Sequence, residues 1–292
     1  MAEENKTITG ETFSGAEAMY TTVFEGCSQY RRPGCFEFAG QKLNLVFDNG
    51  EEFIIDFLDG QNLTWTKIGG QAEYHKYDCL KATNVHYLVH FEKKGLWPRE
   101  GVTLVVDLAR DLVTGNFLTQ GAVEDYINLV TRNLQFGAIR RPGKPLSTER
   151  HEHTKDLIGK KIQYTYSPVF SIIHIYYSEH LCRGTIPPER RAQMPPVPES
   201  ERKLFEEESI YLKIAPNVYV FSWIEKNFGS GTQGFMLMDT TRIHDCGCFF
   251  GVNPQGEPES YMITAYGKYI TEELPEEKII SPYTYETKGD LS

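Results

Sequence analysis

The stretch NVYVFSWIEKN at residues 217–227 decides the fold, because the chain contains a close copy of it. The copy reads NVHYLVHFEKK and lies at residues 84–94. Both are dominated by aromatic and β-branched residues, which is typical of β-strands. A strand that occurs twice in one chain indicates an internal duplication.

The similarity extends to both sides of the repeated strand. Downstream, TLVVDLAR at 103–110 matches FMLMDTTR at 235–242, and GNF at 115–117 matches GCF at 247–249. Upstream, FIIDFL at 53–58 matches SIIHIY at 171–176, which places Asp56 opposite His174. The offset changes from 118–119 to 132–133 at RGTIPPERRAQMPPVPES, residues 183–200. This proline-rich insertion is predicted to be a surface loop, since proline does not fit inside strands or helices.

Each half of the chain is rich in short strands joined by turn signals. Seven strand-like runs fall between residues 42 and 118, and Asn-Gly, Asp-Gly and Gly-Gly turns separate several of them. An antiparallel meander of this kind removes its exposed edges by closing into a barrel. The predicted fold is therefore all-β, with two tandem antiparallel barrels. The predicted organisation is an N-terminal extension (1–38), a first barrel (39–121), a helix at 122–134 with a linker to 156, a second barrel (157–270) and a C-terminal tail (271–292).

Composition excludes several classes of function. The net charge is −10, and no Lys/Arg cluster is longer than a pair, so nucleic acid is not expected as a partner. No apolar run reaches membrane-spanning length, and the polar N-terminus does not resemble a signal peptide. A cytoplasmic protein with six reduced cysteines is expected. No phosphate-binding loop or dinucleotide motif occurs, and Cys246-Gly-Cys248 and the RHEHTKD segment at 150–156 lack the usual zinc spacing. No cofactor or metal is expected.

The repeated strand has one face that suggests a ligand site. In the second copy this face consists of Tyr219, Phe221, Trp223 and Glu225, and its counterpart in the first copy consists of His86, Leu88, His90 and Glu92. Aromatic walls with a few polar groups are typical of the interior of a ligand-binding barrel. The alternative is a solvent-facing side whose glutamate pairs with a lysine on a neighbouring strand.

The second half adds groups that are suited to proton transfer. His174 and Tyr176 share a strand face, and burial of a glutamate nearby would raise its pKa. A histidine or glutamate tuned in this way can remove a proton next to a carbonyl, and a tyrosine can stabilise the enolate. For His174 the alternative is a core histidine with satisfied hydrogen bonds. Asp107 and Asp239 each lie in an apolar strand, and their alternative role is to close a turn or to pair with Arg110 or Arg242. The candidate catalytic residues are Glu225, His174, Tyr219, Glu92 and His90, and the candidate substrate-binding residues are Tyr176, Phe221, Trp223, His86, Asp239 and Asp107.

Several motifs resemble a known family. The segments RHEHTKDLIGKKIQYTYS (150–167), HIYYSEH (174–180) and YLKIAPNVYVFSWIEK (211–226) resemble the C-terminal domain of the molybdenum cofactor biosynthesis protein F family. The segments LNLVFDNGEEFIIDF (43–57) and YDCLKATNVHYLVHFEK (77–93) resemble its N-terminal domain. The resemblance implies two lipocalin-like (calycin) barrels. The proline-rich insertion and the extended N-terminus with Cys27 and Cys35 depart from the bacterial pattern, and the sequence is closer in character to a fungal member acting in secondary metabolism.

Three functions follow as hypotheses. The favoured one is a cofactor-independent enzyme that acts on a small carbonyl or polyketide-type metabolite by proton abstraction, leading to aldol- or Claisen-type condensation, cyclisation or isomerisation. The second is a non-catalytic carrier of a small apolar ligand. The third is an accessory role in molybdenum cofactor formation, for which Lys81 and Lys213 are the candidate cations. The second barrel is the favoured site and the first remains open, as do the oligomeric state and whether the barrels are separate or merged.

Overall fold

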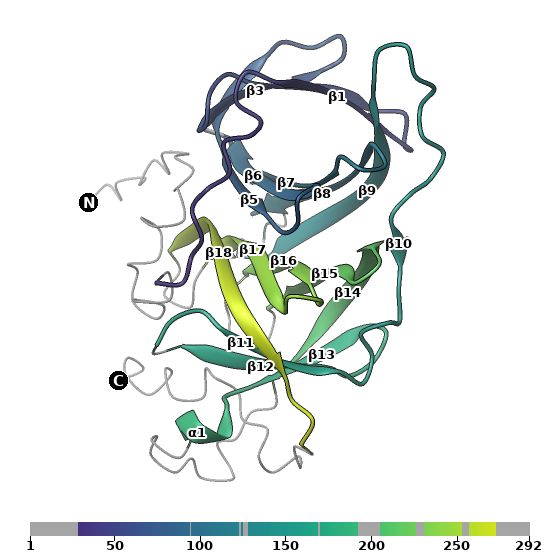
Figure 1. Cartoon of the computed structure of the whole chain (residues 1–292). Helices are drawn as coiled ribbons and strands as arrows, with labels where there is room; N and C mark the ends of the chain where they lie inside the picture. Colours follow the sequence, from purple (N-terminus) through teal and green to yellow (C-terminus); the bar gives the residue numbers. More distant parts are fainter. Residues whose placement is uncertain are drawn as a thin grey trace, which may run out of the picture.

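The computed structural model describes residues 29–93, 95–122, 124, 128–168, 170–191, 205–225, 231–252 and 257–272 (Figure 1). Four parts of the predicted organisation lie wholly or largely outside these residues. They are most of the N-terminal extension with Cys27, residues 123 and 125–127 of the predicted helix, the proline-rich segment after residue 191, and the C-terminal tail after residue 272.

The first half of the chain forms a nine-stranded antiparallel sheet in the order β4-β3-β2-β1-β9-β8-β7-β6-β5. Only Tyr77 separates β4 from β5, so one run of chain pairs first with β3 and then with β6, and the sheet closes on itself (Figure 1). The strands are β1 Lys42–Phe47, β2 Glu52–Phe57, β3 Asn62–Lys67, β4 Glu73–Lys76, β5 Asp78–Lys81, β6 His86–Lys93, β7 Arg99–Asp107, β8 Leu112–Gln120 and β9 Val130–Arg140.

The second half forms a second closed barrel. Its sheet runs β10-β14-β13-β12-β11-β18-β17-β16-β15, and an additional pairing of β14 with β15 completes a ring of eight strands with β10 attached to β14. The elements are β10 Glu152–His153, β11 Lys161–Thr165, β12 Ser171–Tyr176, β13 Leu181–Thr185, α1 Pro188–Arg191, β14 Phe205–Ala215, β15 Val218–Ile224, β16 Gln233–Asp239, β17 His244–Val252 and β18 Pro258–Tyr269. The predicted all-β fold with two tandem barrels is confirmed.

The helix predicted for residues 122–134 is wrong over its second half. Residues from Val130 onward belong to β9, which pairs with β8 on one side and with β1 on the other. Apolar residues at helical spacing also suit a strand that is half-buried, and strand pairing overrides a local helix signal here because β1 and β8 would otherwise present unpaired edges. The first barrel therefore extends to Arg140, beyond the predicted boundary at residue 121.

Strand register shows how the two halves correspond. His86 pairs with Asp107 in the first barrel, and Val218 pairs with Asp239 in the second, so both partners differ by 132 positions. Likewise Lys81 pairs with Tyr87, and Lys213 with Tyr219. Upstream of the proline-rich segment the offset between the two halves is 119 residues. Lys42 pairs with Asp56 in the first barrel, and the equivalent pair in the second barrel is Lys161 with Ile175.

These registers correct the alignment drawn from sequence. The alignment of the repeated strand with an offset of 133 residues is wrong by one residue, and so is the alignment of Asp56 with His174, whose offset is 118. Since strand side chains alternate between faces, a slip of one position exchanges the inner and outer faces. The true counterpart of His174 is Ile55, and that of Trp223 is Phe91.

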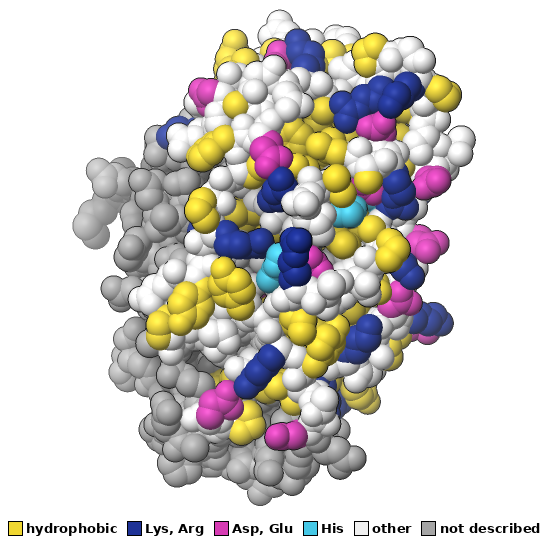
Figure 2. Space-filling view, viewed as in Figure 1, with side chains coloured by type: hydrophobic (Ala, Val, Ile, Leu, Met, Phe, Trp, Pro, Cys, Tyr) yellow, Lys and Arg dark blue, Asp and Glu magenta, His cyan; other side chains and the backbone are white. Residues whose placement is uncertain are grey.

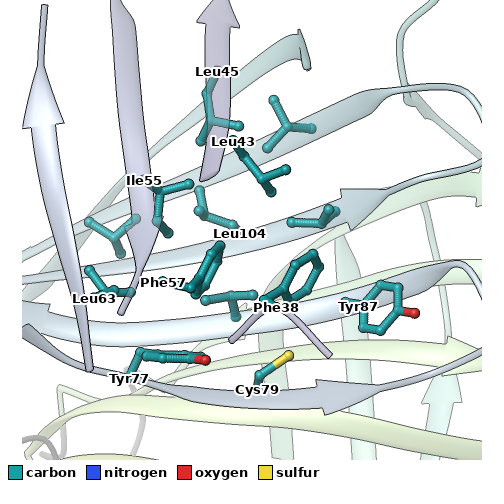
Figure 3. Packing of buried hydrophobic residues seen from close by; sticks show 14 of the residues in the cluster. Phe38, Leu43, Leu45, Ile55, Phe57, Leu63, Tyr77, Cys79, Tyr87 and Leu104 are labelled. Atoms are coloured by element: carbon teal, nitrogen blue, oxygen red, sulfur yellow. The ribbon is translucent and has the colours of Figure 1, made fainter. Parts of the chain in front are cut away.

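The two barrels pack against each other through an apolar layer. The outer faces of β5 to β7 contribute Leu80, Leu88 and Val105, which form one cluster with Val220, Leu237 and other residues of the second barrel. The interior of the first barrel is a separate apolar core, shown in part in Figure 3. On the face of the molecule in Figure 2, acidic and basic side chains are interspersed with apolar ones rather than gathered by sign.

Candidate functional site

The interior of the second barrel is lined by an aromatic wall on β14 and β15. Tyr219, Phe221 and Trp223 all belong to its buried cluster. The rings of Tyr211, Phe221 and Trp223 stack in sequence, with centroid separations of 5.8 and 4.8 Å. Trp223 leans over Gly234, where a Cβ atom would lie 2.4 Å from the indole. The expectation that this face of β15 points into a barrel is correct.

His174 lies against this wall from the opposite side. Its ring centroid is 5.1 Å from that of Phe221, 5.5 Å from Trp223 and 5.9 Å from Tyr164. The side chain is 2% exposed, and its Nδ1 has no hydrogen-bond partner among the described residues. Burial lowers the pKa of His174 to about 3, so the imidazole is neutral at physiological pH.

Two acidic side chains face the interior where β15 and β18 approach one end of the barrel. Glu225 and Glu259 are 4% and 5% exposed, and the Trp223 indole donates to Glu225 Oε1 over 3.4 Å. Glu259 Oε2 accepts from the Thr232 hydroxyl at 3.2 Å. Burial, and then repulsion from Glu225, raise the pKa of Glu259 to about 8. Glu259 is therefore protonated at neutral pH and can donate a hydrogen bond.

A third acid lies deeper on β17. Asp245 accepts hydrogen bonds from the Ala265 backbone at 2.8 Å and from the Tyr166 hydroxyl at 3.2 Å. Burial nevertheless raises the pKa of Asp245 to about 7. On β14, Glu207 is opposite Cys182 and 1% exposed. The second barrel thus holds several acidic groups inside a largely aromatic lining.

Three tyrosines divide into two roles. The hydroxyls of Tyr164 and Tyr176 both contact the Met238 sulfur, at 3.1 and 3.3 Å, and burial raises the pKa of each well above its usual value. Because a thioether is a weak acceptor, these hydroxyls can turn to a better one. Tyr219 instead donates to Asp156 at 3.1 Å, and Asp156 also pairs with Lys213 at 2.8 Å.

The first barrel has apolar residues at the matching positions. Ile55 replaces His174, and it pairs with Trp65 where His174 pairs with Gly184. By the same registers, Phe57 stands for Tyr176 and Leu45 for Tyr164. All of these first-barrel residues are buried in one apolar cluster. The polar interior is therefore a property of the second barrel.

The candidate residues of the first barrel do not form an interior site. Tyr87, Val89 and Phe91 point inward, so His86, His90 and Glu92 point outward toward the second barrel. The predicted inward orientation of this face is wrong, and the one-residue slip in register is the reason.

Contacts between the barrels occupy these outward groups. Glu92 receives two hydrogen bonds of 2.9 Å from Arg99, which also donates to the Gly251 carbonyl of the second barrel at 2.7 Å. His90 contacts the Thr103 hydroxyl at 2.9 Å and the Ser260 hydroxyl at 3.0 Å. Burial lowers the pKa of His90 to about 4.

The two aspartates close equivalent turns. Asp107 Oδ1 accepts from the backbone of Ala109 and Arg110, and Asp239 Oδ1 accepts from the backbone of Thr241 and Arg242. Asp107 also lies 3.6 Å from both His86 and His151. Burial opposes ionisation of Asp107, but its hydrogen bonds outweigh burial and lower its pKa. These contacts match the turn-closing alternative.

Sequence reasoning missed Glu259, Asp245, Glu207, Tyr164 and Gly184. Glu259 alternates with Tyr261 and Ile263 along β18, so strand periodicity could have found it. Gly184 carries no signal in the sequence, because its meaning comes from the register that places Trp65 at the same point of the first barrel.

Among the described residues there is a surface pocket, but neither a metal-binding cluster nor a membrane-spanning helix. Among them, no group of three or more His, Cys, Asp or Glu side chains is arranged to hold a metal ion. No helix in the described part of the chain is long and apolar enough to cross a membrane. A surface pocket of about 170 Å³ lies over β14, lined by residues that include His153, Lys155, Glu179 and Tyr211.

The closed antiparallel barrels, one of them with a polar and aromatic interior, define a lipocalin-like β-barrel protein. The family model described as the MoaF N-terminal domain matches residues 16–117, so this part of the chain, which includes most of the first barrel, is similar to the MoaF family. No curated protein matches the chain.

Proposed function

We propose that the second barrel binds a small carbonyl metabolite and catalyses cofactor-independent proton transfer on it, leading to aldol- or Claisen-type bond formation, cyclisation or isomerisation. The observation that carries this proposal is the buried Nδ1 of His174, which lies against the aromatic wall and has no hydrogen-bond partner among the described residues. A buried polar group without a partner costs about 1–3 kcal/mol. The first barrel avoids this cost with Ile55, so a ligand that hydrogen-bonds to His174 explains why the second barrel retains it.

The surrounding groups suit the chemistry. The neutral imidazole takes a proton from the carbon next to the carbonyl, and the electron pair of the broken C–H bond moves to the carbonyl oxygen. The hydroxyls of Tyr164 and Tyr176 contact the Met238 sulfur, a weak acceptor, and can turn to the enolate oxygen. Protonated Glu259 beside Glu225 supplies a second donor. An enzyme of secondary metabolism would fit this chemistry.

The aromatic lining also supports the alternative of a carrier for a small apolar ligand. The two functions differ at His174. A carrier retains binding when an apolar residue of similar size replaces the histidine, whereas the enzyme loses turnover.

The family match favours a second alternative, an accessory role in molybdenum cofactor formation. A pterin phosphate would need cations in the binding site. Lys213 is paired with Asp156, and Lys81 with Glu37 at 2.6 Å. This pairing of the candidate lysines is why we rank the carbonyl metabolite first.

The test uses the purified full chain in D₂O with a panel of 1,3-diketones and aryl ketones. Mass spectrometry measures exchange of the hydrogen next to the carbonyl. The proposal expects exchange above the buffer rate with the wild type and with Ile55→Leu, and loss of that exchange with His174→Leu. If a ligand quenches Trp223 fluorescence equally in all three proteins and none of them exchanges hydrogen, the protein is a carrier. Failure of a deletion strain to grow on nitrate would instead support the molybdenum role.

A further inference from the structure

We propose that Cys35 and Cys79 are a redox modification site that forms a reversible disulfide between the N-terminal segment and β5. This inference does not depend on the proposed function. The two residues are 44 positions apart in the sequence, and both belong to the core cluster at one end of the first barrel. Figure 3 shows the Cys79 sulfur among the labelled side chains of this core.

Backbone geometry places the two cysteines side by side. The Cys35 amide donates to the Cys79 carbonyl over 2.7 Å. One residue earlier, a Cβ atom on Gly34 would lie 3.7 Å from the same carbonyl and 3.6 Å from Asp78 Oδ1. Residues joined by such a bond between extended chains have Cα atoms about 5–6 Å apart. This separation falls within the range that disulfides span without moving the backbone.

The two thiols differ in the way that disulfide exchange requires. Interaction with the Cys79 thiol is the largest cause that lowers the pKa of Cys35 to about 7, and Lys81 contributes in the same direction. Burial raises the pKa of Cys79 well above its usual value. Cys35, at 9% exposure, is therefore the attacking thiolate, and Cys79 is the resolving thiol that lies under it.

The remaining described cysteines serve as an internal contrast. Cys182 and Cys248 are fully buried, and burial raises the pKa of each to about 12. Cys246 is also buried, with its pKa raised. In none of these three cysteines does a second cysteine thiol lower the pKa. Oxidation is thus directed to one pair of the five described cysteines.

The disulfide would fasten a segment that holds both barrels together. Before Cys35, Arg31 donates to the Met262 carbonyl at 3.1 Å and also pairs with Asp78. Arg32 donates through its backbone to the Thr264 hydroxyl at 2.9 Å and through its guanidinium to the Asp245 carbonyl at 3.1 Å. A covalent bond at Cys35 would therefore anchor these contacts with β17 and β18 to β5 of the first barrel.

The oxidant is a peroxide. The Cys35 thiolate attacks one peroxide oxygen, the O–O bond breaks, and a sulfenic acid and hydroxide form. The Cys79 thiol then attacks the Cys35 sulfur, an S–S bond forms and the sulfenic oxygen leaves as water. Overall, two thiols lose two hydrogen atoms and hydrogen peroxide becomes two molecules of water. A small dithiol reverses the reaction by thiol–disulfide exchange.

The test uses the full chain with Cys27→Ser, because Cys27 lies outside the described residues. Equimolar hydrogen peroxide is added under native conditions, and the intact mass and unreduced peptides are analysed. The proposal expects loss of two hydrogen atoms, one cross-linked peptide pair containing Cys35 and Cys79, and recovery with dithiothreitol. It also expects Cys35 to react with iodoacetamide at least about tenfold faster than Cys182 at neutral pH.

Two variants make the result decisive. With Cys79→Ser, Cys35 should stop at the sulfenic acid, which dimedone traps, while Cys182→Ser should cross-link as the parent does. The proposal is overturned if Cys35 in the parent accumulates as sulfenic or sulfinic acid without bonding to Cys79. It is equally overturned if Cys35 bonds to another cysteine, or stays reduced while the buried cysteines oxidise.

Discussion

His174 and Ile55 occupy equivalent positions in the two barrels, but one side chain is polar and the other is apolar. Ile55 is fully buried in an apolar core, whereas His174 brings an imidazole whose Nδ1 has no partner among the described residues. The same backbone thus supports a packed core in one barrel and a polar interior in the other. This difference is why we propose a structural role for the first barrel and ligand chemistry for the second.

Replacing His174 with leucine should stabilise the protein while removing its function. The change removes an unsatisfied polar group and restores the apolar character of the first barrel, so the free energy of unfolding should rise by about 1 kcal/mol. Urea unfolding measures this gain. A loss of more than about 2 kcal/mol would mean that the imidazole contributes to the core and would contradict its assignment as a ligand-binding group.

His174→Leu should also change how stability depends on pH. The folded-state pKa of about 3 lies below the ordinary histidine value of 6.5, so the stability contribution of neutral His174 is fully present above pH 6.5 and is lost as the pH falls toward 3. Without this group, the slope of unfolding free energy against pH in that window should decrease by up to about 1.4 kcal/mol per pH unit. Denaturant unfolding between pH 4 and 6.5 checks it, and an unchanged slope would contradict the buried neutral imidazole.

Glu259 should affect the pH dependence of stability in the opposite direction to His174. Its folded-state pKa of about 8 lies above the ordinary glutamate value of 4.5, so the stability contribution of protonated Glu259 is present below pH 4.5 and is lost as the pH rises through 8. Glu259→Gln mimics the protonated acid and should make the protein more stable than the wild type at pH 9, with little difference at pH 5. Melting temperatures at the two pH values measure this, with exposed Glu272→Gln as the control. Equal shifts at both pH values would refute a buried, protonated Glu259.

Gly184 pairs with His174, and Trp65 pairs with Ile55 at the equivalent place in the first barrel. Exchanging these two residues tests whether the ligand binds in the second barrel and not in the first. Gly184→Trp gives the second barrel the residue that covers Ile55 in the first, so ligand binding should be lost while the protein remains folded. Trp65→Gly opens a cavity in the first barrel and should cost about 3–5 kcal/mol without preventing binding. Fluorescence titration and thermal melts report the two effects. Unchanged binding in Gly184→Trp would place the ligand elsewhere.

The pair of Glu92 and Arg99 should act on stability alone. Both side chains are almost fully buried between the barrels, so Glu92→Ala leaves an unpaired guanidinium and should cost about 3–5 kcal/mol. The double variant Glu92→Leu with Arg99→Met should recover much of this loss. Hydrogen exchange with the ketone panel should be unaffected in any variant that is folded at the assay temperature. A specific loss of turnover in a folded Glu92 variant would return this residue to the catalytic candidates.

The sequence was sufficient to predict the duplication and both barrels, because repeated strands and turn signals are local patterns. It also placed Tyr219, Phe221 and Trp223 correctly inside the second barrel. It failed at β9, where the spacing of Val130 and Leu134 suits a helix as well as a strand, and where pairing with β1 and β8 decides between them.

The errors at the site have one physical origin. Side-chain direction in a strand depends on register, and hydrogen bonds between strands set the register in the folded barrel. Aligning His86 with Tyr219 rather than with Val218 turned an interface into an apparent interior. The pairing of Glu92 with Arg99 was similarly hidden, since nothing in one barrel's sequence indicates where a second barrel will pack.

The measurement that tests the central claim most directly is LC–MS of metabolites from a strain that lacks this gene and carries the wild type, His174→Leu or Ile55→Leu. The account predicts that a metabolite lost on deletion returns with the wild type and with Ile55→Leu, but not with His174→Leu expressed at an equal level. If His174→Leu restores the metabolite as fully as the wild type does, the interior of the second barrel is not the active site.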